Sequence, residues 1–216
     1  MSLTDELRSI LKGEVDDSEE TREKYSRDAS LYRMEPKVVV RPKGVADIQA
    51  LVKYASEHSG VSLTPRSAGT DMSGGVLSSS VVVDMMKNFN HVVEVGADYG
   101  VVEPGVYFRD FDKETKKKGL ELPSYTASRE ICAVGGMVGN NAGGEKHLKY
   151  GKTDKYVQEL EVVMADGEVH TLNKDTVNDY SQKLSALLKQ NQALIAEHKP
   201  ESAQKLFRLC NLGFRS

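Results

Sequence analysis

Two glycine-rich segments of the 216-residue chain have the residue types that bind a phosphate group. The first is PRSAGTDMSGG at residues 65–75, directly after an apolar run typical of a strand. Small residues there let main-chain N–H groups approach an anion, and Thr70 and Ser73 can add hydroxyl donors, so we expect an anion nest. A standard Rossmann fold is disfavoured, because residues 71–80 lack the helical apolar spacing that should follow a GxGxxG fingerprint.

The second segment is VGGMVGNNAGG at residues 134–144. Bare backbone at several positions leaves space for a flat ring system with a pyrophosphate tail, and a side chain at Gly69 or Gly136 is expected to fill that space. Asn140 and Asn141 can offer amide groups to ring atoms, although asparagine also favours turns. One glycine cluster alone is as typical of a turn as of a site. Two clusters, each beside a predicted strand, favour a binding site.

Other chemistry-bearing residues do not predict a catalytic or metal site. A basic patch follows the second segment, and we interpret it as a solvated face. It consists of Lys146, His147, Lys149, Lys152 and Lys155. No carboxylate or metal-ligand partner is evident for His147, so no catalytic residue is assigned. Cys132 and Cys210 are expected to be free thiols, since two distant cysteines lack the spacing of a zinc site.

Composition narrows the class of protein. A formal charge of −3 gives no general attraction to nucleic acid or acidic membranes, and 39% apolar residues suffice for a core. The acidic N-terminal stretch has no signal-peptide pattern, and no apolar run is long enough to cross a bilayer. We expect a cytoplasmic protein, at most peripheral to a membrane.

Periodicity predicts a first lobe with a partly parallel sheet. Residues 3–12 are expected to form a helix and 14–20 a mobile acidic connector, with the folded body beginning near Tyr25. Strands are predicted at 38–42, 61–65 and 81–85, with a helix at 44–58. The predicted parts are an N-terminal helix and connector at 1–24, a first lobe at 25–90 and a second lobe at 91–216.

The second half follows a different pattern. Short strands flank a turn at residues 96–98, and an amphipathic helix is predicted at 107–118. Residues 156–172 read as two strands joined at Asp166-Gly167, the strongest hairpin signal in the chain. A last helix is expected from Thr176 to His198, ended by Pro200.

An ordered series of motifs carries a family resemblance. The motifs are RPKGVADIQALVKYA from Arg41, PRSAGTDMSGG from Pro65, EPGV from Glu103, PS from Pro123, ICAVGGMVGNNAGGEKHLKYGKT from Ile131 and ADGEV from Ala165. Over roughly residues 25–172 the chain resembles the FAD-binding (PCMH-type) domain of the vanillyl-alcohol oxidase/p-cresol methylhydroxylase superfamily. It is most similar to the D-lactate dehydrogenase and glycolate oxidase flavoproteins. The resemblance implies an α+β fold of two lobes with FAD between them.

The resemblance also implies which residues bind FAD. The pyrophosphate loop would be Arg66, Ser67, Ala68, Gly69 and Thr70, with Ser73 and Gly74 beside it. The flavin and ribityl chain would be lined by Pro123, Ser124, Thr126, Gly135, Gly136, Gly139, Asn140, Asn141 and Gly144. Glu168 and Val169 would lie near the adenine. Because Thr70 stands where covalent members of the family often have histidine, non-covalent FAD is expected.

The resembling flavoproteins imply a reaction. Hydride passes from C2 of a 2-hydroxy acid to flavin N5, while a separate cap domain clamps the carboxylate and takes the hydroxyl proton. No cap follows in these 216 residues, and the tail KLFRLCNLGFRS does not match the glycine-rich strand VGSEGTLG of the family. We therefore expect the FAD-binding portion of an oxidoreductase, as a fragment, a truncated product or half of a split enzyme that needs a separate cap chain.

Three alternatives stay open at this point. The chain can be a flavin-binding module without catalysis, or a remnant that no longer holds cofactor. It can also be the electron-transfer FAD subunit of a molybdenum hydroxylase, which the AGTD run favours and the NNAGGEKHLKYG run opposes. The sequence identifies neither the hydroxy acid, nor the electron acceptor, nor the oligomeric state.

Overall fold

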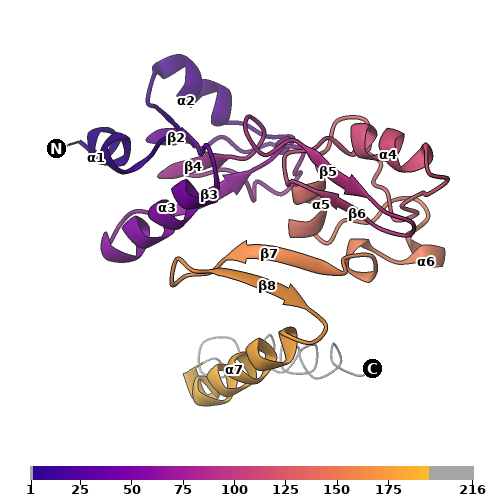
Figure 1. The fold of residues 1–216 in the computed structure, drawn as a ribbon. Helices are drawn as coiled ribbons and strands as arrows, with labels where there is room; N and C mark the ends of the chain where they lie inside the picture. Colours follow the sequence, from indigo (N-terminus) through magenta and orange to yellow (C-terminus); the bar gives the residue numbers. More distant parts are fainter. Residues whose placement is uncertain (1, 195–216) are drawn as a thin grey trace. The chain divides into compact units, whose positions relative to one another are not determined.

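The structure is a computed structural model that describes residues 2–194 (Figure 1). It falls into two compact units, the first made of residues up to 157 with 162–170, the second of 158–161 with residues from 171 onward. The predicted helix end at His198 and Pro200, the Cys210 thiol and the unmatched tail lie outside the described residues. Predicted boundaries at residues 24 and 90 stay predictions.

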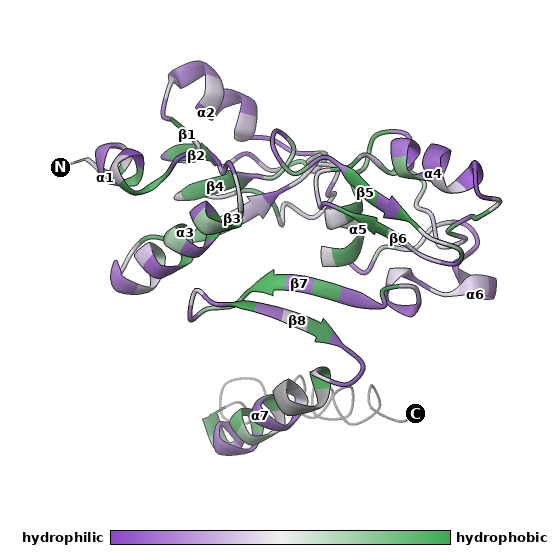
Figure 2. Cartoon of the chain, viewed as in Figure 1, coloured by the Kyte–Doolittle hydropathy of each residue, from purple (hydrophilic) through white to green (hydrophobic). Residues whose placement is uncertain are grey.

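A four-stranded sheet in the order β1-β2-β4-β3 organises the N-terminal part of the chain. It consists of β1 (Glu14–Asp16), β2 (Val38–Arg41), β3 (Leu63–Arg66) and β4 (Val81–Asp84). The strands β2, β4 and β3 run parallel, and β1 is antiparallel to β2. Central parallel strands are covered on both faces, which is why β2 and β4 are valine runs (Figure 2). The three predicted strands are confirmed to within about two residues.

Helices cover this sheet on both sides (Figure 1). The predicted helix is confirmed as α3 (Val45–Glu57), which contributes the fully buried Leu51, and α1 (Leu3–Ile10) contributes Leu7 to the same core. The first glycine-rich segment has no helix between β3 and β4, as predicted.

The acidic connector is where the structure corrects the sequence. Residues 14–20 are not mobile, because they form β1 and the start of α2 (Glu19–Tyr25). Val15 is buried in the core, and the Asp47 carboxylate accepts hydrogen bonds from the Lys12 and Gly13 N–H groups at 3.0 and 2.9 Å. Asp16 accepts a 2.6 Å hydrogen bond from the Thr21 hydroxyl, which holds the pKa of that carboxyl well below its usual value. Asp16 thus accepts hydrogen bonds from Ser18 and Thr21, and Glu14 forms ion pairs with Arg41 and Lys87.

After the four-stranded sheet comes a two-stranded antiparallel ribbon of β5 (Val92–Val95) and β6 (Gly100–Val102). It is followed by α4 (Phe108–Lys116), α5 (Val134–Gly139), α6 (His147–Tyr150) and the 3-10 helix η1 (Thr153–Lys155). The second core contains Val106, Phe108, Phe111, Tyr125, Cys132 and Met137. The strands and α4 were predicted, whereas α5 occupies half of a segment predicted as a loop, and α6 and η1 were not predicted.

The remaining elements are β7 (Glu159–Val163), β8 (Val169–Asn173) and α7 (Val177–Gln190). The turn between β7 and β8 lies at Asp166-Gly167, as predicted, with φ of +78° at Gly167. The Gly167 carbonyl accepts a 2.9 Å hydrogen bond from Gln49, which ties the turn to α3. Within residues 2–194, no helix is both long and apolar enough to span a bilayer.

The N-terminal helix is expected to contribute strongly to stability. Leu7 is fully buried, so Leu7→Ala should lower the free energy of unfolding by about 2–5 kcal/mol, measured by urea denaturation of the apo-protein. Ile10 is 41% exposed on the same helix, so Ile10→Ala should cost less than about 1 kcal/mol. Equal effects of the two substitutions would contradict a packed N-terminal segment.

Candidate cofactor-binding site

The carboxyl ends of the parallel strands carry a charged cluster around Tyr25. Arg41 ends β2, Arg66 ends β3 and Asp84 ends β4, so the three residues lie at the sheet edge where ligands bind in parallel sheets. The Tyr25 hydroxyl donates a 2.6 Å hydrogen bond to Asp84, and the Arg66 guanidinium lies 5.2 Å from the Tyr25 ring centre. Burial and the Asp84 carboxylate raise the pKa of Tyr25 to about 12.

Arg66 is turned toward the backbone of residues 25–27. Its guanidinium donates hydrogen bonds to the carbonyl oxygens of Tyr25 at 3.1 Å and Arg27 at 2.7 Å. A Cβ atom at Gly69 would lie 2.5 Å from Arg66 Nη2, and Gly69 has φ of +69°. Gly69 is therefore bare because the guanidinium packs there and because the backbone turns left-handed. This reason differs from the ligand space expected from the sequence.

The Asp71 carboxylate shapes the rest of the first segment. Its Oδ2 accepts hydrogen bonds from Ser73 N–H at 3.1 Å, the Ser73 hydroxyl at 2.8 Å and Gly75 N–H at 2.7 Å. These bonds, the one from Gly75 foremost, lower the pKa of Asp71. A carboxylate of the chain itself thus engages donors that the sequence predicted for a phosphate. The half-buried residues Ser67, Ala68, Gly69 and Thr70 precede it.

Two glycines of the second segment are bare because protein atoms press against them. A Cβ at Gly135 would lie 2.5 Å from Pro104 Cβ and 2.7 Å from its carbonyl oxygen, and a Cβ at Gly144 would lie 2.0 Å from the Tyr125 carbonyl oxygen. Any side chain at either position would collide with backbone. These two glycines are explained by packing within the chain.

Gly136 and Gly139 have no such explanation. A Cβ at either position would meet no other atom within 4 Å, and both residues are exposed. They are three residues apart on α5 and so lie on one face, whereas Met137 is 2% exposed and packs into the core. We call the exposed Gly136–Gly139 surface the bare face of α5. Such a face allows a flat ligand to approach the helix backbone.

Residues 123–126 lie beside α5. Tyr125 shares a buried cluster with Met137, and its hydroxyl donates a 2.9 Å hydrogen bond to Glu145. Ser124 is 1% exposed, and its Oγ has no hydrogen-bond partner in the described part of the chain. Leaving a buried hydroxyl without a partner costs about 1–3 kcal/mol. A ligand atom that bonds to Ser124 would remove this cost.

The neighbours of Ser124 are less open to a ligand. Pro123 is half-buried. Thr126 is 7% exposed, and its hydroxyl lies 3.0 Å from the Ser128 hydroxyl and 3.4 Å from Cys132 Sγ. The Thr126 hydroxyl is therefore engaged within the core. Its predicted role at the flavin stays a prediction.

Three hydrogen bonds bring the two glycine-rich segments together. The Pro104 carbonyl oxygen accepts one from the Ser67 hydroxyl at 3.2 Å and one from Gly135 N–H at 2.9 Å. Asn140 Nδ2 donates a 3.1 Å hydrogen bond to Asp71 Oδ1. The segments are more than fifty residues apart in sequence, yet these hydrogen bonds hold them next to each other. Sequence reasoning missed Pro104 and Asp71, although both lie in the motifs EPGV and AGTD.

The remaining predicted residues serve their local structure. Asn141 has φ of +44°, and its side-chain oxygen accepts a 3.0 Å hydrogen bond from Asp154 N–H in η1. Glu168 forms a 2.9 Å ion pair with Lys53 of α3, and Val169 begins β8. A place for Glu168 and Val169 near the adenine stays a prediction.

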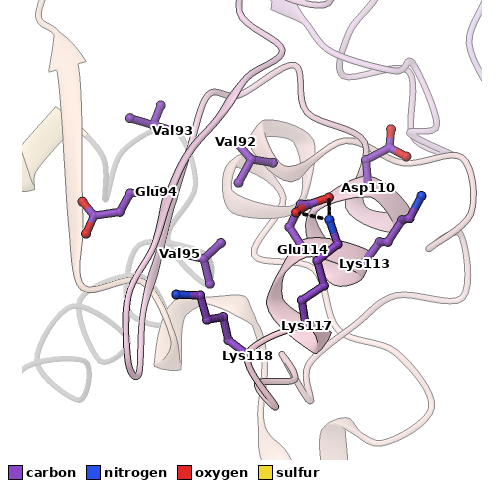
Figure 3. Close-up of a pocket in the computed structure, with 9 residues that line it drawn as sticks. All are labelled: Val92, Val93, Glu94, Val95, Asp110, Lys113, Glu114, Lys117 and Lys118. Carbon is purple, nitrogen blue, oxygen red and sulfur yellow. Dashed lines mark hydrogen bonds and ion pairs between the residues drawn. The ribbon is translucent and has the colours of Figure 1, made fainter.

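A cavity of about 620 Å³ lies elsewhere, between β5 and α4 (Figure 3). It is lined by Val92, Val93, Glu94, Val95, Asp110, Lys113, Glu114, Lys117 and Lys118. Lys117 and Glu114 form a 2.6 Å ion pair along its wall. None of the predicted cofactor residues is among these lining residues. Within residues 2–194, no three His, Cys, Asp or Glu side chains cluster so as to hold a metal ion.

A family model described as the FAD binding domain matches residues 36–173, more than half of the chain. The chain belongs to this family of FAD binding domains, and FAD is its cofactor. The bare face of α5 and the unpartnered Ser124 hydroxyl both fit such a ligand. Thr70 at the position often held by a covalently linked histidine is consistent with non-covalent binding.

The names of several curated relatives describe oxidases or dehydrogenases of 2-hydroxy acids. Glycolate oxidase subunit GlcD of Bacillus subtilis (strain 168) is 35% identical over 158 residues, 71% of this chain and 33% of that protein. D-lactate dehydrogenase of Archaeoglobus fulgidus is 33% identical over 146 residues, which cover 67% of this chain and 32% of that protein. D-2-hydroxyglutarate dehydrogenase of Escherichia coli (strain K12) is 30% identical over 148 residues, which cover 67% of this chain and 14% of that protein. The chain thus spans about a third or less of these relatives.

Solved structures show the same fold. Alkyldihydroxyacetonephosphate synthase matches with a TM-score of 0.67 and 21% identity, over 78% of this chain and 34% of that chain. For 6-hydroxy-D-nicotine oxidase from Arthrobacter nicotinovorans the TM-score is 0.65 at 22% identity, over 77% of this chain and 37% of that chain. At this identity the likeness concerns the fold alone. It confirms the predicted PCMH-type α+β architecture.

Substitution at the bare face should separate cofactor binding from folding. Gly136→Val fills space that no protein atom occupies, so we expect FAD affinity to fall at least about tenfold. The urea concentration at the midpoint of apo-protein unfolding should equal or exceed that of the native chain, because valine favours helix more than glycine does. Gly135→Val should destabilise the fold itself, because Pro104 blocks its Cβ. The measurements are flavin fluorescence titration and urea unfolding. Native FAD affinity in Gly136→Val would show that FAD does not contact this face.

Tyr25 predicts an alkaline instability. Its folded pKa of about 12 exceeds the ordinary value of 10.0, so the stability it provides is present below pH 10 and lost as pH rises to 12. The free energy of unfolding of the native chain should fall more steeply across this range than that of Tyr25→Phe. Parallel pH profiles for the two proteins would contradict the Tyr25–Asp84 hydrogen bond.

Proposed function

We propose that the chain is the FAD-binding part of a flavin-dependent oxidoreductase that oxidises 2-hydroxy acids of the D-lactate or glycolate type. The proposal draws on the names of the curated relatives and on the family. The observation that carries the site is the bare face of α5, joined by hydrogen bonds to the first glycine-rich segment.

Each part of the surface has a distinct role in holding FAD. Residues 67–70 contact the pyrophosphate, and the bare face of α5 accepts the flavin and ribityl chain. The Ser124 hydroxyl donates or accepts one hydrogen bond to the ligand. Fixing the cofactor in this way lowers the entropic cost of reaching a reactive geometry.

When bound, FAD would supply the redox chemistry by serving at N5 as the acceptor for the hydride removed from C2 of the hydroxy acid. The protein must still clamp the substrate carboxylate and remove the hydroxyl proton. We assign both tasks to a cap domain that lies outside the FAD-binding residues 36–173. His147, which follows the second segment, has its Nδ1 2.9 Å from the Gly144 carbonyl oxygen and is exposed, an arrangement that serves the local turn.

Anaerobic mixing tests the substrate class. The FAD-loaded chain is supplied with the cap domain and mixed with D-lactate, glycolate or D-2-hydroxyglutarate, and bleaching of the visible flavin absorbance is followed. We expect at least one of these 2-hydroxy acids to reduce the flavin faster than 3-hydroxypropionate, the 3-hydroxy isomer of lactate, with dithionite defining full reduction. NADH serves as a second donor, and reduction by NADH alone would contradict the proposal.

A second candidate is a flavin-binding module without substrate oxidation. The family model that matches residues 36–173 is described by FAD binding alone, which favours keeping this candidate. This candidate predicts bound FAD that dithionite reduces and none of the three hydroxy acids does. The same mixing experiment therefore separates the two.

A further inference from the structure

Asp71 is the residue whose side chain contacts both glycine-rich segments. Its Oδ2 accepts the Ser73 and Gly75 donors of the first segment, and its Oδ1 accepts the 3.1 Å hydrogen bond from Asn140. Asn140 stands at the end of α5, where its own N–H donates to the Gly136 carbonyl at 3.1 Å. A single hydrogen bond, from Asn140, thus links the Asp71 carboxylate to the end of α5 next to its bare face.

We propose that Asp71 is a positioning residue that sets the bare face of α5 against the first glycine-rich segment and thereby determines FAD affinity. This rests on the proposed role of these segments in holding FAD. The Pro104 carbonyl fixes the N-terminal end of α5 through Gly135, and Asp71 fixes the opposite end through Asn140. Two fixed ends define the orientation of a helix only six residues long.

Asp71 suits this task because a carboxylate has two acceptor oxygens. One oxygen is occupied by the turn at residues 73–75, which holds the side chain in place, so the other points to Asn140 in a fixed direction. Hydrogen bonds to a charged group are stronger than those between neutral groups. The hydrogen bonds from Gly75, Ser73 and Asn140 also keep the Asp71 carboxyl ionised, since they lower its pKa.

Asp71 could also affect FAD binding through its negative charge, and that effect has the opposite sign to positioning. A carboxylate beside a pyrophosphate repels it, so an Asp71 that acted only through its charge would weaken FAD binding. Its removal would then raise affinity. Positioning and repulsion therefore predict changes of opposite sign.

The test uses the full chain and FAD titration followed by flavin fluorescence. Asp71→Ala and Asn140→Ala should each weaken FAD binding by about tenfold to a hundredfold, because the same hydrogen bond is lost. The double variant should be no weaker than the poorer single variant, since both changes remove one shared contact. Asn140→Asp should weaken binding as well, because it sets two carboxylates against each other.

A polarity exchange supplies the rescue. In the pair Asp71→Asn with Asn140→Asp, donor and acceptor change places, so the bond between the segments forms again and FAD affinity should return to within about threefold of native. If Asp71→Ala also destabilises the apo-protein, this pair decides, because it keeps both side-chain shapes and the net charge. Failure of the pair to improve on Asn140→Asp would overturn the proposal.

Controls separate this proposal from the site itself. Asp110→Ala removes an exposed carboxylate at the cavity between β5 and α4 and should leave FAD affinity unchanged. Native or tighter FAD binding by Asp71→Ala, together with loss of binding in Gly136→Val, would refute the role of Asp71 alone. Native affinity in both variants would refute the proposed site.

Discussion

The Pro104 carbonyl oxygen is the contact on which the cofactor surface depends, because it accepts hydrogen bonds from both glycine-rich segments. Its position is fixed by Gly105, where a Cβ would lie 2.3 and 2.5 Å from the carbonyl oxygens of Met85 and Phe89. Gly105 N–H also donates to Phe89 at 2.7 Å. The end of β4, the turn before β5 and the start of α5 therefore meet at Pro104-Gly105. No side chain larger than hydrogen fits at Gly105.

The glycines of the second segment divide into two kinds that look alike in sequence. Gly135 and Gly144 are bare so that backbone segments can approach each other, and they would be needed in a protein without ligand. Gly136 and Gly139 weaken α5, since glycine disfavours helix by about 1 kcal/mol relative to alanine, and no protein atom occupies the space they leave. This destabilisation, with no packing contact to explain it, supports our proposal that the face leaves space for the cofactor.

Local patterns predicted the elements that depend on local chemistry. The valine runs of β2 and β4, the helical spacing of α3 and the Asp166-Gly167 turn were all evident. The strand β1 was missed because three residues carry no period, and its order comes from pairing with β2 and from Asp47 more than thirty residues away. Helix α5 was missed because glycine predicts a loop, whereas burial of Met137 holds the helix. The bond between Asp71 and Asn140 joins distant positions and left no local signal.

Hydrogen exchange of backbone amides, with and without FAD, tests the location of the cofactor most directly. The account predicts that FAD slows exchange in both residues 67–70 and residues 136–140, while α4 and β5 around the separate cavity keep their apo rates. Protection confined to residues 92–95 and 110–118, with both glycine-rich segments unchanged, would contradict it.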